Sequence, residues 1–233
     1  MNAQPPGLGR GGRRQLPEEV AAHVRELIIS GVVRPGEFLR MEHIAEAVGV
    51  SNTPVREGLL SLRSAGFVRL VPRRGFVVAP FTPQDVRDLF WAQAQLAGEL
   101  AARAATRITP AQVRRLEDVL GEHLRAVEND DRERIAGLGH DFHREINRAA
   151  GSHRLSLLLG AMVRHLPNRF YATIQEQVHM TVNDHPELLA ALTDGDPRAA
   201  RTLMRQHILA GADHLIGRLE ERGVWRQGEE SAS

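Results

Sequence analysis

Helical and β-type patterns follow one another in a set order near the start of the chain, and this order limits the folds open to it. Three segments with apolar residues at helical spacing come first, over 17–31, 41–48 and 52–65. Two β-like runs follow, over 68–71 and 75–79, joined by a short connection that begins with proline. Three short helices followed by a hairpin form the outline of a winged helix-turn-helix.

The chain after residue 80 has helical patterns throughout. Thr82, Thr109 and Asp196 are each followed by proline, so each offers a capping side chain before a proline that the first helical turn tolerates. Because the connections are short, neighbouring helices should run antiparallel in a bundle. The expected helices cover 82–105, 109–128, 130–150, 155–166, 168–180, 184–192 and 196–222.

These patterns predict a mainly α protein with two domains. A winged helix-turn-helix of three helices and a β-hairpin wing is expected over 15–80. An antiparallel, all-α helical bundle is expected over 81–223. Residues 1–14, where glycine and proline break any periodicity, and residues 224–233 are expected to be tails.

Positive charge is concentrated in the first domain. Residues 1–80 contain 11 arginines against 7 acidic residues, whereas residues 81–233 contain 19 arginines against 22 acidic residues. There is no lysine, so every basic contact is made by a planar guanidinium group, which suits phosphates and guanine edges. Beside a matching motif, this asymmetry supports a nucleic-acid partner for the first domain.

The composition excludes several classes of protein. Without cysteine there is no disulfide framework and no thiolate chemistry. No apolar run approaches the roughly 20 residues that span a bilayer, and residues 1–15 lack the apolar core of a secretory signal. No nucleophile-base arrangement, phosphate-binding loop or dinucleotide-binding glycine run is present. We therefore expect a cytoplasmic protein that is not an enzyme and has no membrane partner.

The most specific stretch covers residues 48–60 and reads VGVSNTPVREGLL. It resembles the recognition-helix signature of the GntR family of bacterial regulators, usually written GVSRTPVREAL. The sequence departs from this signature at Asn52, where arginine is commoner, and at Gly58, where alanine is commoner. The resemblance implies a transcription regulator that binds double-stranded DNA.

The physical chemistry of this stretch agrees with the resemblance. Residues 51–53 begin a helix, where free N–H groups and the helix dipole favour phosphate oxygens and where recognition helices read bases. Arg56 follows one turn later, placed for a guanine edge or a phosphate; a solvated arginine or an ion pair with Glu57 is the alternative. The expected DNA-binding residues, with those of the wing tip, are Ser51, Asn52, Thr53, Arg56, Arg73, Arg74 and Gly75.

Residues 82–222 resemble the FCD domain, the ligand-binding domain of the fatty-acid-regulator branch of the GntR family. The markers are the Phe-His pair at 142–143, the HPELLAAL segment from 185 and the RQHI segment from 205. The resemblance implies that His143, His185 and His207 bind a divalent metal inside the bundle. Neutral imidazoles suit zinc or nickel. A purely hydrogen-bonded histidine network is the alternative.

One ligand that these relatives usually have is missing. It is an aspartate four residues before the first histidine, and Gly139 occupies this position here. His140 is the nearest replacement, whereas Asp141 should face elsewhere on the helix. The other histidines are interpreted as surface or packing residues, namely His23, His43, His123, His153, His165, His179 and His214.

The resemblance further implies a small-molecule effector, in many relatives a carboxylate. Relatives often hold the carboxylate with an arginine and a glutamate in the first bundle helix, but residues 91–98 have no charged side chain here. The candidates for replacing them are Gln93, Gln95, Asn147 and Arg164.

The family resemblance implies a homodimer, formed largely through the helical domains, that places two recognition helices on an inverted repeat. Effector binding would then change operator affinity. There are two alternatives to this interpretation. The His140-Asp141 pair and the histidine-rich bundle are compatible with a helical metal-dependent hydrolase. A purely architectural DNA-binding protein would leave the large bundle without a role.

Overall fold

The computed structural model describes residues 12–163, 178–221 and 223–225. The chain forms two compact units. Of the described residues, those up to Thr82 and those from Leu219 onward form the first unit, and those between Pro83 and Arg218 form the second. Within the described parts, no helix is both long enough and apolar enough to cross a membrane.

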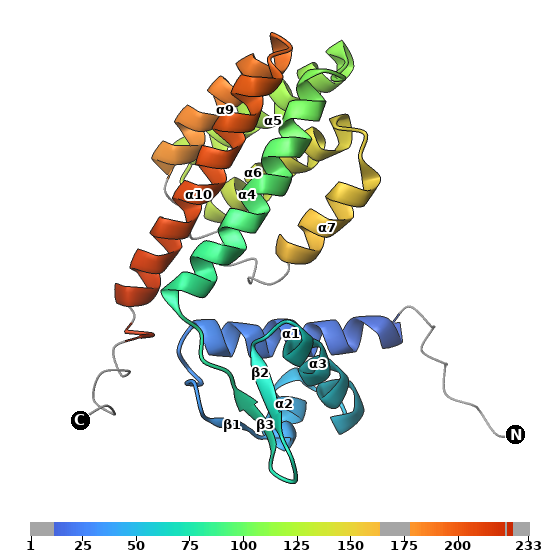
Figure 1. Cartoon of the computed structure of the whole chain (residues 1–233), viewed down its shortest axis with the longest axis vertical. Helices are drawn as coiled ribbons and strands as arrows, with labels where there is room; N and C mark the ends of the chain where they lie inside the picture. The colour runs from blue at the N-terminus through green and yellow to red at the C-terminus, as the bar shows by residue number, and fades with distance from the viewer. Residues whose placement is uncertain (1–11, 164–177, 222, 226–233) are drawn as a thin grey trace, which may run out of the picture. The chain divides into compact units, whose positions relative to one another are not determined.

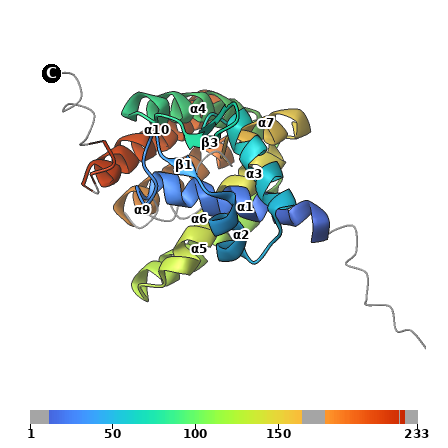
Figure 2. The same ribbon diagram turned by 90° about the horizontal axis from the view of Figure 1, so that it is seen from below.

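The first unit combines three helices with a small antiparallel sheet (Figures 1 and 2). The strand order of the sheet is β1-β3-β2. The sequence predicts only a hairpin, and the third strand arises because Phe38 and Leu39 pair with Val77 and Phe76. The elements are α1 (Gly12–Ile29), β1 (Phe38–Leu39), α2 (Met41–Val48), α3 (Asn52–Ser64), β2 (Val68–Val71) and β3 (Gly75–Val78).

Local signals set the borders of these elements. Gly49 has φ 73° and ends α2, a conformation that glycine adopts without steric cost. Pro54 lies in the first turn of α3, where its missing N–H breaks no helical hydrogen bond. Helix α1 begins earlier than the apolar pattern predicts and continues through Pro17.

The described residues near the end of the chain also belong to the first unit. The indole Nε1 of Trp225 donates a hydrogen bond of 2.6 Å to the backbone oxygen of Phe81. The two rings lie 6.4 Å apart, and the ring of Phe67 lies 6.1 Å from that of Phe81. This aromatic row fixes the segment before Pro83 and the described end of the chain within one unit.

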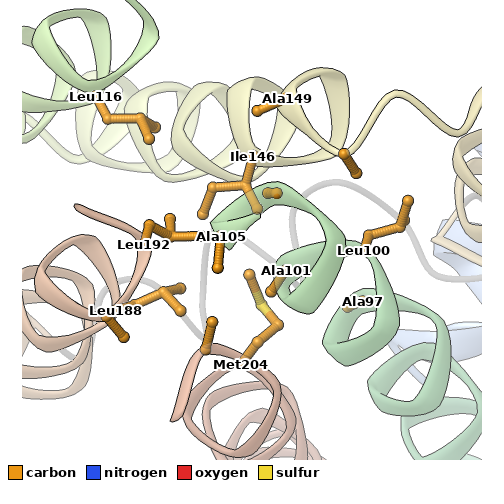
Figure 3. Packing of buried hydrophobic residues seen from close by; sticks show 14 of the residues in the cluster. Ala97, Leu100, Ala101, Ala105, Leu116, Ile146, Ala149, Leu188, Leu192 and Met204 are labelled. Carbon is orange, nitrogen blue, oxygen red and sulfur yellow. The ribbon is translucent and has the colours of Figure 1, made fainter. Parts of the chain in front are cut away.

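The second unit is helical. Its core contains side chains from six helices. Leu100, Leu116, Ile146, Leu192 and Met204 belong to it, and all five are almost fully buried (Figure 3). The helices are α4 (Pro83–Ala105), α5 (Pro110–Glu128), α6 (Arg132–Ala149), α7 (His153–Val163), α9 (Val178–Thr193) and α10 (Pro197–Glu221).

Caps and one close contact determine how these helices begin and pack. Thr109 and Gln112 form a reciprocal capping box at the start of α5, and Asp131 caps α6. A side chain at Gly98 of α4 would meet Cγ of Arg205 at 2.6 Å and the backbone oxygen of Arg201 at 3.1 Å. Glycine therefore allows α10 to approach α4 closely.

The region before residue 193 differs from the prediction of two short helices. A single helix, α9, runs from Val178 to Thr193 through Pro186, and most of the predicted helix at 168–180 lies outside the described residues. Proline costs an internal hydrogen bond. Burial of Leu188 and Leu192 on the same helix stabilises it in compensation.

Candidate DNA-binding surface and metal-ligand site

The start of α3 presents polar side chains to solvent. Ser51 is the N-cap residue, but its side chain makes no cap hydrogen bond. Asn52, Thr53 and Arg56 are exposed on the same end of the helix. The free N–H groups of the first turn point the same way, so this end of α3 is suited to phosphate oxygens and base edges.

The opposite side of α3 is fixed by burial. Val55, Leu59 and Leu62 are fully buried. Because these contacts prevent rotation of α3 about its axis, Arg56 stays on the solvent side of the helix. Helix α1 packs so closely here that a side chain at Gly58 would lie 2.7 Å from the backbone oxygen of Pro17 and 2.8 Å from a methyl group of Val20. This contact explains why glycine replaces the commoner alanine of the signature.

The two wing arginines have different surroundings. Arg73 lies at the turn with φ 63°, and Gly75 follows with φ 99°. The guanidinium of Arg74 lies over the ring of Phe38, 4.5 Å from the ring centroid. Arg74 is thus held against the sheet by a cation–π contact, while Arg73 projects from the turn as an exposed cation.

In the second unit, three helices bring histidines together. His143 of α6, His185 of α9 and His207 of α10 each offer a ring nitrogen, and these nitrogens all lie within 4.8 Å of one another. The ring centroids are 5.0 to 5.2 Å apart. His140 and the remaining acidic and histidine residues of the described chain do not join this group.

The surroundings of His143 and His185 favour neutral imidazoles at these two positions. Burial lowers the pKa of His143 and of His185 well below the ordinary value, and the neighbouring histidines lower it further. Nδ1 of His207 lies 3.0 Å from a carboxylate oxygen of Asp184. Nε2 of His143 and Nε2 of His185 are buried without a hydrogen-bond partner in the described structure. Neutral rings with unpartnered nitrogens are the form that a metal ion requires.

A cavity of about 410 Å³ opens beside the cluster and is lined by residues of α4, α6, α7 and α10. His143 and His207 form part of its wall. Its other polar lining residues are Gln93, His140, Arg144, Asn147, Arg148 and Ser156, and the rest of the wall is mainly apolar.

The predicted effector residues are only partly brought together. Gln93 and Asn147 line the cavity, whereas Gln95 does not, and Arg164 lies outside the described residues. The sequence interpretation missed Arg144 and Arg148. Their spacing of four residues on α6 was the available signal, because side chains four residues apart share a helix face.

Both of these arginines already have acidic neighbours on the same helix. Arg144 forms an ion pair of 2.7 Å with Asp141, and Arg148 forms one with Glu145. Both arginines are largely exposed, so these pairs contribute little to stability and can exchange partners.

The domain comparisons cover both units. Residues 16–78 match the gntR family of bacterial regulatory proteins, and residues 88–210 match the FCD domain. The chain belongs to the GntR family, in the branch with an FCD domain. It is a DNA-binding transcriptional regulator.

Relatives of this GntR regulator match over most of its length. An uncharacterized HTH-type transcriptional regulator of Streptomyces ambofaciens is 33% identical, covering 89% of this chain and 86% of the relative. The regulator McbR of Escherichia coli is 27% identical over 87% of this chain and 96% of its own. The solved structure of McbR shares the fold, with a TM-score of 0.64 and 24% identity over 89% of this chain and 98% of that chain. The comparisons give no support to a hydrolase.

Proposed function

We propose that this GntR regulator binds an inverted-repeat operator as a homodimer and that a carboxylate metabolite, held together with a divalent metal in the FCD domain, sets its operator affinity. The observation that carries the proposal is the shared position of the histidine cluster and the cavity. Two of the three clustered histidines line the same cavity as two arginines, Arg144 and Arg148.

The histidine cluster fits a borderline divalent metal. His143, His185 and His207 would supply three neutral nitrogen ligands, which suits zinc or nickel. A bound metal would supply a localised positive charge to an anionic effector. Gly139 provides no carboxylate, so coordination positions would stay open for water or for the effector itself.

The cavity fits a carboxylate that carries an apolar body. Arg144 and Arg148 are positive, Gln93 and Asn147 offer amide donors, and the apolar part of the wall includes Leu159. A guanidinium group binds a carboxylate with two parallel hydrogen bonds. We propose these four polar residues as the effector contacts, and omit Gln95 because it does not line the cavity.

The proposed DNA contacts are those of the exposed end of α3 and of the wing. A helix-turn-helix protein that binds as a symmetric dimer reads two half-sites related by a two-fold axis. Family membership supports this arrangement and a site of action in the cytoplasm, where bacterial DNA is located.

The decisive experiment selects operator DNA from random duplexes and then measures its binding at fixed salt. Titrations are made with zinc, with a panel of mono- and dicarboxylates, and with both together. We expect at least one carboxylate to change operator affinity in the parent protein but not in an Arg144→Gln, Arg148→Gln double variant. Light scattering of the complex should give two chains per duplex. An operator affinity that no metal or carboxylate changes would contradict effector control.

A further inference from the structure

A fourth histidine lies in the interior beside the cluster. His123 is on α5, on the same buried stripe as Leu116 and Ala126, and is only 1% exposed. Its ring centroid lies 6.0 Å from that of His185. Helix α5 packs against both α6 and α9, which carry His143 and His185. The sequence interpretation treated His123 as one of the surface or packing residues, without distinguishing it.

The burial of His123 has no explanation in the packing alone. Neither of its ring nitrogens has a hydrogen-bond partner within the described structure. A neutral imidazole has one donor and one acceptor, and burying them without partners costs stability. For stability alone, an apolar side chain would serve better at this position.

We propose that His123 is a positioning residue for the metal-binding cluster and that it orients the His185 ring through one water, bound to the ring nitrogen of His185 that does not face the metal. The inference rests on the proposed metal site. His123 does not line the effector cavity, so its influence would pass through His185.

The cluster already contains one contact of this kind. Asp184 lies 3.0 Å from Nδ1 of His207, which leaves Nε2 of that ring for a metal. Metal-binding histidines in general give their second nitrogen to such a partner, which fixes the orientation and tautomer of the ring. Among the described residues, no carboxylate joins the three clustered histidines, so the orientation of each imidazole should weigh heavily on metal affinity.

The experiment compares His123→Phe and His123→Gln in the full chain. Zinc affinity is measured by competition with a chromophoric chelator, and the visible spectrum of the cobalt-loaded protein reports ligand geometry. We expect His123→Phe to weaken zinc binding about 10- to 100-fold and to change the cobalt spectrum. Without metal, its unfolding temperature should equal or exceed that of the parent, because an apolar ring replaces unpartnered nitrogens. His123→Gln keeps polar atoms and should recover most of the zinc affinity.

A matched control is His153→Phe, which removes an exposed histidine of α7 and should bind zinc as the parent does. Parent-like zinc affinity in His123→Phe would overturn the inference. So would equally weak binding by the Phe and Gln variants together with a lowered unfolding temperature, since that result describes a packing residue. If the parent itself binds no zinc or cobalt, the proposed metal site fails and this inference fails with it. Effector control by a carboxylate alone would remain testable.

Discussion

Gly58 is required by a contact between α1 and α3 that the local sequence does not reveal. It lies inside α3, where glycine lowers helix stability relative to alanine by roughly 1 kcal/mol. Glycine is nevertheless needed here, because backbone and side-chain atoms of α1 lie within 3.0 Å of the position that a Cβ atom would occupy. The residue therefore determines how closely α1 packs behind the recognition helix.

The first prediction concerns this contact. Gly58→Ala should destabilise the protein by about 1–3 kcal/mol, because the new methyl group forces α1 away from α3. Urea unfolding monitored by circular dichroism measures the change. Gly121→Ala is the matched control, since Gly121 lies in α5 with no atom within 4 Å of the added methyl group, and it should be neutral or slightly stabilising. A Gly58→Ala variant as stable as the parent would show that α1 can move away from α3 without lowering the free energy of unfolding.

Arg56 gives the second residue-scale prediction. It is exposed, whereas Val55 and Leu59 on the other side of the helix are buried, so it is available for a base edge or a phosphate. Arg56→Ala should weaken binding to the selected operator by about 1–3 kcal/mol if the side chain reads a base. Fluorescence anisotropy at one salt concentration measures this. Arg125→Ala removes an exposed arginine from α5 as a control for net charge. Equal operator affinities for Arg56→Ala and the control would remove Arg56 from the interface.

At the scale of elements, α3 and the wing are expected to divide recognition between them. The first turn of α3 carries side chains that can distinguish bases. The wing carries arginines on a turn, of which one stacks on Phe38 and the other extends outward. Arginines on such a tip most readily meet phosphates or the minor groove, which contribute affinity more than sequence discrimination.

The third prediction follows for the wing. Arg73→Asn keeps a residue that tolerates a positive φ, so the turn should persist while the charge is lost. Affinities for operator and random DNA should fall by the same factor, and the slope of log affinity against log salt should decrease by about 1. Titrations at several salt concentrations on both duplexes measure this. A loss confined to the operator would instead assign base reading to Arg73.

At the scale of the whole molecule, the buried histidines couple stability to pH. The pKa values of His143 and His185 are lowered in the folded protein, chiefly by burial. In the unfolded chain these histidines have their ordinary pKa of about 6.5. Below this pH the unfolded chain therefore binds more protons than the folded protein does. This contribution to stability is fully present above that value and is lost as pH falls toward the lowered folded pKa.

The fourth prediction is that the unfolding temperature, measured with a chelator present, falls between about pH 7 and about pH 5. A His143→Asn, His185→Asn double variant should show a flatter profile over the same range. His153→Gln, at an exposed position, should keep the parent profile. The carboxylate of Glu99 does not account for this range, since hydrogen bonds from Arg201 and Arg103 lower its pKa from 4.5. Identical profiles for parent and double variant would contradict the assignment.

The sequence by itself determined the mainly α fold, the winged helix-turn-helix and most element borders. These depend on signals between near neighbours, such as Thr109 before Pro110 at the start of α5 or Gly49 at the end of α2. The recognition-helix motif is also a short contiguous stretch, so the sequence alone was enough to identify the motif and the resemblance to the family.

Only the tertiary structure decided which residues from distant parts of the chain lie next to one another. It made Phe38 and Leu39 a third strand, placed His123 beside His185, and put Arg144 rather than Gln95 on the cavity wall. Each of these outcomes depends on packing between residues far apart in the chain. Periodicity indicates which face of a helix is buried, but not which other helix packs against that face. The histidine cluster and the cavity of this regulator depend on which helices pack together.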